Sequence, residues 1–358
     1  MMNDRLAKAR ERFGALDIDA LLVTQAENRR YLSGFTGSAG ALLIARDRAV
    51  VATDSRYWEQ AQKQAPAFEL VQIKTRLEDH FAEMLQRAGQ PQRIGFESAS
   101  VTVDQFTSWS KVESLDVEWL ATKDAVEPVR AVKDEAELDA IRKAVALTDA
   151  GFDYLCTVIK PGMTEREVAW ELEVYLRTHG ADALAFETIL ASGPNGAMAH
   201  YRSGDRVIRP GEPIVMDFGA RVEGYCADLT RTVCLGRADA RYDEVYGVVR
   251  RAQRAAIDGI RAGMKGVEAD AIARDVIISA SYGENFGHGL GHGVGLAIHE
   301  APRASRVAGE ELLPAGATLT IEPGVYLAGW GGVRLEDLTV VRENGVEVLS
   351  HAHKHPVI

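Results

Sequence analysis

The chain has 358 residues, of which 46% are hydrophobic and 26% are charged. Its length suggests about two domains, and its composition is that of an ordinary globular protein with enough apolar material for a core. The formal net charge of −11 argues against a sequence-independent grip on nucleic acid or on an acidic membrane surface, so neither is expected as a partner.

Two features of the sequence predict where the protein works. Residues 1–13 (MMNDRLAKARERF) include acidic side chains and no apolar segment, and no run of about 18 apolar residues occurs later, so neither a signal peptide nor a membrane span is expected. The three cysteines, Cys156, Cys226 and Cys234, form no CxxC pair. This pattern favours a reducing cytoplasm and argues against both disulfides and a thiolate zinc site.

The first 124 residues alternate between strand-like and helix-like segments. Helices are expected at 4–16, 60–64 and 77–87, and strands at 19–24, 41–45, 49–53, 68–73, 93–96 and 117–120. This alternation predicts an α/β domain built on one sheet. The loop 28–40 is rich in glycine and serine, but it lacks the GK[ST] pattern of a phosphate-binding loop.

A long helical pattern over 129–154 follows, and we predict domains at 1–124 and 125–358. The second domain contains an internal duplication. IKPGM at 159–163 is repeated as IRAGM at 260–264, DFG at 217–219 as EPG at 322–324, and DLT at 228–230 as EDLT at 336–339. Matched segments in the same order argue against chance and predict two similar halves.

Four carboxylates occupy matched places in these halves. Asp217 follows the apolar run 214–216, and Asp228 lies in a second strand-like run after a turn, so the two could face each other across an antiparallel pair. Glu322 and Glu336 repeat the pattern. Four unrelated surface acids are the alternative, but an unpaired acid directly after an apolar strand would be costly. Carboxylates this close repel one another unless a cation separates them, so we expect an acidic cage that binds cations.

Histidines accompany the carboxylates in residues 286–300, FGHGLGHGVGLAIHE, where glycine allows a close approach of the backbone. The segment contains His288, His292 and His299. One imidazole with four carboxylates makes an oxygen-rich site that favours Mn, Co, Fe or Mg, and four carboxylates suit two ions better than one. The pair His299-Glu300 does not begin a zincin HExxH motif, because Arg303 stands where the second histidine would be.

These residues resemble those of the pita-bread metallopeptidases, the superfamily of methionine aminopeptidase, aminopeptidase P, prolidase and creatinase. The resemblance to the catalytic domain runs from about residue 136 to the end. NRRYLSGFTGSAGALLI (28–44) and TDSRYWEQA (53–61) resemble the amino-terminal domain of aminopeptidase P and prolidase, which methionine aminopeptidases lack. The resemblance implies an α/β (α+β) chain: an amino-terminal creatinase-like α/β domain, then a pita-bread catalytic domain with an internal pseudo-twofold duplication.

The resemblance also implies a cofactor of two divalent metal ions per subunit, with manganese favoured and cobalt, iron or zinc as alternatives. The implied ligands are Asp217, Asp228, His292, Glu322 and Glu336. Asp228 and Glu336 would bridge the two ions. Asp217 would also bind the first ion, and His292 and Glu322 would also bind the second.

The remaining roles implied by the resemblance concern the reaction. A water or hydroxide shared by the ions would be the nucleophile, and Glu322 would carry the proton. His299 would stabilise the tetrahedral intermediate, His200 and His288 would line the substrate pocket, and Arg334 would brace the carboxylates.

The expected function is hydrolysis of the Xaa-Pro bond at the amino terminus of peptides, with peptides that carry proline in second position as partners. The sequence favours an aminopeptidase P over a prolidase, which cuts dipeptides only, because no obvious clamp for a proline carboxylate is visible beyond Arg202 and Arg206. Two further alternatives are a non-catalytic peptide-binding module on the same fold and a metal-free creatinase-like hydrolase; the complete set of acids argues against both. A homodimer or homotetramer is expected from the family.

Overall fold

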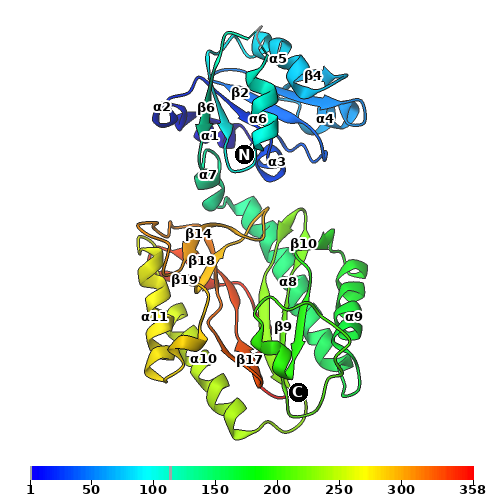
Figure 1. Ribbon diagram of the computed structural model, residues 1–358, viewed down its shortest axis with the longest axis vertical. Coiled ribbons are helices and arrows are strands. Elements are labelled where there is room, and N and C mark those ends of the chain that lie inside the picture. Colours follow the sequence, from blue (N-terminus) through cyan, green and yellow to red (C-terminus); the bar gives the residue numbers. More distant parts are fainter. Residues whose placement is uncertain (1, 113–114) are drawn as a thin grey trace. The chain divides into compact units, whose positions relative to one another are not determined.

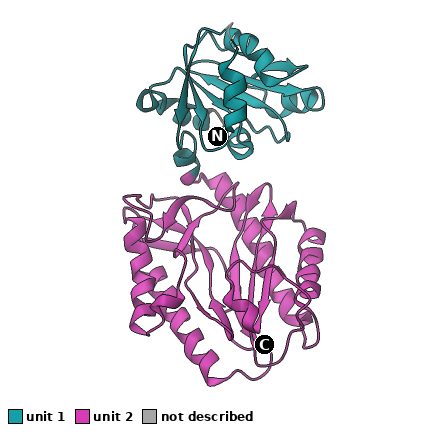
Figure 2. Cartoon of the chain, viewed as in Figure 1, with its two compact units in different colours: residues 1–130 teal, residues 131–358 magenta. Residues whose placement is uncertain are grey.

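The computed structural model describes residues 2–112 and 115–358 (Figure 1). Contacts divide the chain into two units, 1–130 and 131–358 (Figure 2), and the short helix α7 (Glu127–Ala131) ends at their junction. The domain boundary expected between residues 124 and 125 stays a prediction. Within the described ranges, no helix has both the length and the apolar character needed to cross a membrane.

Unit 1 is built on a mixed six-stranded sheet in the order β4-β3-β2-β1-β5-β6. Its strands are β1 (Ala20–Val23), β2 (Ala41–Ala45), β3 (Ala49–Asp54), β4 (Glu69–Ile73), β5 (Arg93–Glu97) and β6 (Glu118–Thr122). Its helices are α1 (Met2–Glu11), α2 (Phe13–Leu16), α3 (Ala26–Ser33), α4 (Trp58–Gln64), α5 (Phe81–Arg87) and α6 (Val103–Ser110), with a 3-10 turn η1 (Leu77–His80). Because β1 and β2 are apolar throughout, they are buried along their whole length, as expected for strands covered on both faces. The predicted α/β domain with one sheet is confirmed.

Unit 2 has helices on two sides of a set of short antiparallel strands (Figure 1). The helices are α8 (Glu135–Val158), α9 (Glu165–Thr178), α10 (Ala240–Gly259) and α11 (Gly266–Ser279), with 3-10 turns η2 (Gly193–Ala197) and η3 (Gly283–Asn285). The strands are β7 (Ala183–Leu184), β8 (Ile189–Ser192), β9 (Pro213–Phe218), β10 (Ala220–Val222), β11 (Tyr225–Cys226), β12 (Leu229–Cys234), β13 (Gly291–Gly293), β14 (Glu300–Ala304), β15 (Thr318–Ile321), β16 (Gly324–Leu327), β17 (Gly331–Arg334), β18 (Asp337–Arg342) and β19 (Gly345–Val348).

The two halves of unit 2 repeat one arrangement, which confirms the predicted duplication. In the first half, α8 and α9 precede the antiparallel pair of β9 and β12. In the second half, α10 and α11 precede the corresponding antiparallel pair of β15 and β18. Each half has its own apolar core, one around Phe152, Leu172 and Met216 and the other around Tyr242 and Leu319. Two packed halves therefore flank the centre of the unit.

The helix starts follow from local sequence. Thr164 accepts a hydrogen bond from the backbone N–H of Glu167, whose carboxylate accepts from the backbone N–H of Thr164 at 2.7 Å. This is the capping box that the sequence predicts for α9. Asp134 and Glu137 form the same box at the start of α8. These capping boxes define the residue at which each of the two helices begins.

Candidate metal centre

The four carboxylates lie at corresponding ends of two antiparallel strand pairs. Asp217 lies near the end of β9 and Asp228 directly precedes β12; in that pairing the Cα of Asp217 is opposite that of Thr230. Glu322 directly follows β15 and Glu336 directly precedes β18, which pair in the same antiparallel sense. Both hairpins therefore present their acids at a strand end, where the side chains can converge.

Thr230 joins the two halves at this point. Its backbone carbonyl accepts a hydrogen bond from the N–H of Glu336 at 3.0 Å, and its hydroxyl donates to the Glu336 carboxylate at 2.7 Å. Both residues are buried. These bonds hold the acid of the second half against the strand of the first, so the two halves share one cluster.

His292 enters from β13, where glycine is required for a steric reason. A Cβ at Gly291 would lie 1.8 Å from the carbonyl oxygen of Thr320, so only glycine lets this strand approach β15. The Nδ1 of His292 lies 3.1 Å from the carbonyl oxygen of Gly293 and therefore donates its proton there. The lone pair of Nε2 is left facing the acids, 3.4 Å from Glu322 Oε1 and 3.7 Å from Asp228 Oδ2.

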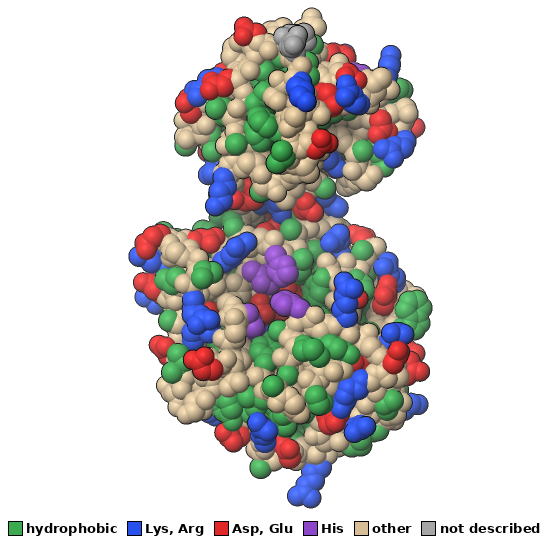
Figure 3. Space-filling model, viewed as in Figure 1, with side chains coloured by type: hydrophobic (Ala, Val, Ile, Leu, Met, Phe, Trp, Pro, Cys, Tyr) green, Lys and Arg blue, Asp and Glu red, His purple; other side chains and the backbone are tan. Residues whose placement is uncertain are grey.

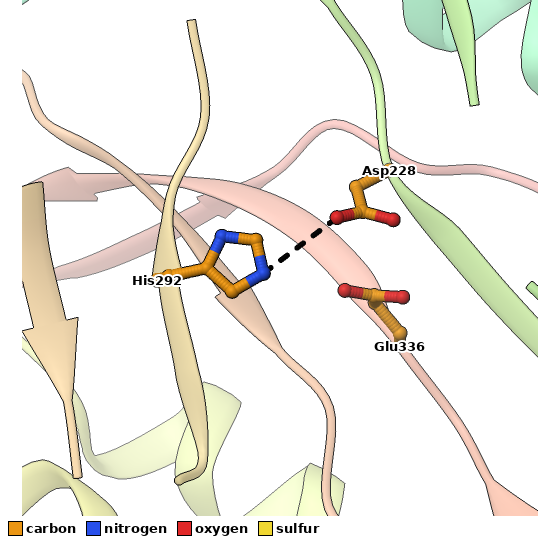
Figure 4. A group of neighbouring side chains, drawn as sticks. All are labelled: Asp228, His292 and Glu336. Atoms are coloured by element: carbon orange, nitrogen blue, oxygen red, sulfur yellow. Dashed lines mark ion pairs between the residues drawn. The ribbon is translucent and has the colours of Figure 1, made fainter. Parts of the chain in front are cut away.

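Three of these side chains meet as a group that could hold a metal ion. One ligand atom from each of Asp228, His292 and Glu336 lies within 4.8 Å of the others, and the three side chains point toward one another from separate segments (Figure 4). Asp217 and Glu322 line the same cavity but do not belong to this closest group. All five predicted ligands are thus brought to one cavity.

The electrostatics of the cluster fit a divalent cation. Burial, followed by the charge of neighbouring carboxylates, raises the pKa of Asp228 and of Glu336 well above the ordinary carboxyl range, and burial raises the pKa of Glu322 to about 8. Burial also lowers the pKa of His292 to about 4, which keeps the imidazole neutral as a metal ligand must be. Asp217 Oδ1 is buried and has no hydrogen-bond partner in the described chain. A cation between these oxygens would relieve both the repulsion and the unsatisfied oxygen.

Arg334 occupies the place expected of a bracing cation. Its Nη2 donates to Asp217 Oδ2 and its Nε donates to the hydroxyl of Thr230 at 3.0 Å. The side chain is buried; burial alone would lower its pKa, but Tyr326, Asp217 and other acidic neighbours raise it well above its ordinary value. The guanidinium therefore stays charged and holds one Asp217 oxygen, which leaves the other oxygen to the cavity.

Sequence reasoning missed Tyr326, which links Arg334 to His288. The His288 Nδ1 lies 2.7 Å from the carbonyl oxygen of Gly289 and donates to it, so Nε2, at 2.8 Å, accepts the Tyr326 hydroxyl proton. The same hydroxyl oxygen accepts from Arg334 Nη1 at 2.7 Å. Both ring nitrogens of His288 are therefore engaged, although the residue lines the cavity as expected. No local motif marks Tyr326, since its position relative to Arg334 depends on the pairing of β16 and β17.

The cavity around the cluster has a volume of about 650 Å³. His200, His288, His292 and His299 line it, and Figure 3 shows histidine side chains gathered around a recess with acidic side chains inside it. The rings of His292 and His299 lie 4.3 Å apart between centroids. Burial lowers the pKa of His299, and the charges of His200 and Arg303 act in the same direction. Every residue that the sequence proposed for the site therefore lines this cavity.

Comparisons with known proteins show the family to which the chain belongs. The model of metallopeptidase family M24 matches residues 139–343, and that of the creatinase/prolidase N-terminal domain matches residues 5–132. An uncharacterized peptidase of Bacillus subtilis is 41% identical over 354 residues, which is 99% of each chain. The chain belongs to metallopeptidase family M24. The predicted resemblance, the fold class and the metallopeptidase activity are confirmed.

Two solved structures show the same two-domain architecture. The Xaa-Pro dipeptidase from Bacillus anthracis aligns over 100% of both chains with a TM-score of 0.96 and 38% identity. The X-Pro aminopeptidase from Thermotoga maritima aligns over 98% of this chain and 99% of its own, with a TM-score of 0.88 and 37% identity. The two names differ in substrate length, so similarity alone does not separate a dipeptidase from an aminopeptidase.

Proposed function

We propose that this enzyme is an Xaa-Pro dipeptidase that recognises the free carboxylate of the proline. The observation that carries the proposal is Arg303, whose side chain lines the metal cavity and whose Cα is opposite His292 in the β13–β14 pair. Within residues 2–112 and 115–358, no carboxylate forms an ion pair with Arg303. A guanidinium without a protein partner at the rim of a cavity can take a carboxylate in bidentate fashion.

The neighbours of Arg303 support an anion at this place. Ser305 lies two residues further along, which puts it on the same side of an extended chain, and it also lines the cavity. Its hydroxyl is buried without a hydrogen-bond partner in the described chain. A carboxylate between the two side chains would satisfy both.

The arginines that sequence reasoning considered are less suitable. Arg206 is engaged by Glu212 at 2.7 and 2.8 Å and by the hydroxyl of Ser192 at 2.6 Å. Arg202 lines the cavity but is 85% exposed and lies 3.5 Å from Glu187. The preference for aminopeptidase P rested on the absence of a clamp, and Arg303 supplies a candidate for one.

Different residues of the chain are proposed to bind metal, to transfer the proton and to stabilise the oxyanion. Asp217, Asp228, His292, Glu322 and Glu336 would hold two divalent ions, with manganese proposed as the native metal. Such ions lower the pKa of a water molecule and so supply the nucleophile near neutral pH. With the ions bound, the Glu322 carboxylate would accept a proton from the water and pass it to the leaving nitrogen of proline. His299 and His200, on the open side of the cavity, donate to the developing oxyanion.

Two further expectations remain proposals. All three cysteines are free thiols, which supports a cytoplasmic location. A homodimer or homotetramer is proposed from the family, and light scattering of the purified enzyme would test it.

The substrate proposal is tested with Ala-Pro, Ala-Pro-amide and Ala-Pro-Ala. The wild-type enzyme should prefer Ala-Pro, and Arg303→Ala should lower kcat/KM for Ala-Pro by about 10- to 100-fold, the value of a hydrogen bond to a charged group, while changing the amide little. Arg202→Ala is the matched control, since it also lines the cavity. Hydrolysis of Ala-Pro-Ala as fast as Ala-Pro by the wild-type enzyme would instead identify an Xaa-Pro aminopeptidase.

A further inference from the structure

Glu165 is a buried carboxylate that neither the metal cluster nor the helix cap uses. It is the first residue of α9 and has 0% exposure. The capping box at this helix start is formed by its neighbours Thr164 and Glu167. A buried carboxylate is costly unless several donors satisfy it, so the identity of its donors indicates its role.

The donors to Glu165 come from a single segment, residues 192–204. Ser192 donates to Oε1 through its N–H at 2.7 Å and its hydroxyl at 2.8 Å. The side-chain amide of Asn195 lies 3.0 Å from Oε1 and 3.2 Å from Oε2, and the N–H of Gly204 lies 3.3 Å from Oε2. One carboxylate therefore ties together the two ends of the segment that carries His200.

The residue next to His200 joins the same network. The Tyr201 hydroxyl accepts from Asn195 at 2.8 Å and makes a hydrogen bond with Glu165. The backbone of the helix start adds two bonds, from the N–H of Glu165 to the carbonyl of Arg206 at 3.0 Å and from the N–H of Arg166 to that of Gly204 at 2.9 Å. The residues before His200 and the residues after it are therefore both hydrogen-bonded to the start of α9.

His200 itself depends on this support. Its side chain lines the metal cavity but makes no hydrogen bond to any described residue, so its position follows from the backbone that carries it. We propose that Glu165 is a positioning residue for hydrolysis: its carboxylate holds residues 192–204 in the conformation that presents His200 to the substrate. This inference rests on the proposed function, because it assumes that His200 contacts the peptide during hydrolysis.

A double-mutant cycle between Glu165→Gln and His200→Ala tests the proposal. Glu165→Gln keeps the size and shape of the side chain but removes its charge and one hydrogen-bond acceptor. It should lower kcat/KM for Ala-Pro by about tenfold or more, because a small misplacement of a group that contacts the substrate has an effect of this size. Both single variants should lower the same kinetic parameter, and Glu165→Gln should cost little further in the His200→Ala background. Bound metal per chain should stay at the wild-type value. Equal losses in both backgrounds would overturn the proposal.

Hydrogen exchange gives a measurement that needs no substrate. Glu165→Gln should speed exchange across residues 192–204, whereas Glu167→Gln, a matched change in the same helix turn, should not. Unchanged exchange in Glu165→Gln would overturn the inference. If the wild-type enzyme fails to cut Ala-Pro, the proposed substrate is wrong, and faster exchange in Glu165→Gln would still uphold the anchoring role of Glu165.

Discussion

Lys133 Nζ lies 2.7 Å from Glu300 Oε1, and the two side chains are only 1% and 7% exposed. Glu300 directly follows His299 and begins β14, so this ion pair holds the chain beside a residue that lines the cavity. The pair joins segments far apart in the sequence, and no local pattern predicts it.

Removing Lys133 should destabilise the enzyme strongly. Lys133→Met should lower the free energy of unfolding by about 3–5 kcal/mol, because it removes the cation that is paired with the buried charge of Glu300. Lys143→Met is the control: its pair with Glu223 is 56% and 58% exposed, so its loss should cost no more than about 1 kcal/mol. Urea unfolding measures both. Equal midpoints for the two variants would contradict the assignment.

Metal content should depend on the two buried acids that join the halves. Asp228→Ala and Glu336→Ala should each lose bound metal and lower activity by more than about 100-fold, because the loss of a residue that only orients a ligand already costs about 10- to 100-fold. Elemental analysis after loading with manganese should give up to two ions per wild-type chain. Glu310→Ala, at a surface ion pair, should bind metal normally. Near-normal turnover in metal-free Glu336→Ala would contradict the assignment of Glu336 as a metal ligand needed for activity.

The metal-free enzyme should lose stability as pH rises above the ordinary carboxyl range. Burial, and after it the charge of neighbouring carboxylates, raises the folded-state pKa of Asp228, Glu322 and Glu336. The native state therefore binds more protons than the unfolded state. Stability is then fully present below the ordinary carboxyl pKa and is lost as pH rises through the folded pKa, which is about 8 for Glu322.

Thermal unfolding with a chelator measures this dependence. Each proton difference contributes about 1.4 kcal/mol per pH unit. Saturation with manganese should flatten the slope between pH 7 and 9, because the cation then compensates the ionised acids. A chelated enzyme whose Tm rises over this range would refute the expectation.

Removing the hydroxyl of Tyr326 while keeping its ring should lower both the stability and the activity of the enzyme. In Tyr326→Phe, the Nε2 of His288 loses its donor and Arg334 loses an acceptor, which should cost about 1–3 kcal/mol of stability. We expect kcat to fall while metal binding is kept. Tyr282→Phe removes a hydroxyl that donates to Glu244 on the exposed surface and serves as the control. Wild-type stability and kcat in Tyr326→Phe would show that the link is dispensable.

The repeated halves and the acids within them could be predicted from the amino-acid sequence alone. Asp217 and Glu322 each directly follow a run of apolar residues in the sequence. This pattern can be recognised in the sequence because a strand that packs against a core needs apolar residues. The alternating glycines around His292 could also be recognised in the sequence. Two backbones that approach each other closely leave no room for a side chain between them, so glycine is required there.

Contacts between residues that are far apart in the sequence could not be predicted and became visible in the folded structure. The contacts of Tyr326 with His288, of Lys133 with Glu300 and of Glu165 with residues 192–204 join segments that no sequence period relates. Arg303 stood in the sequence as the residue that breaks an HExxH motif, and its place at the cavity rim follows from the register of β13 against β14. Such contacts depend on how separately formed elements pack, and a single sequence carries no direct record of that packing.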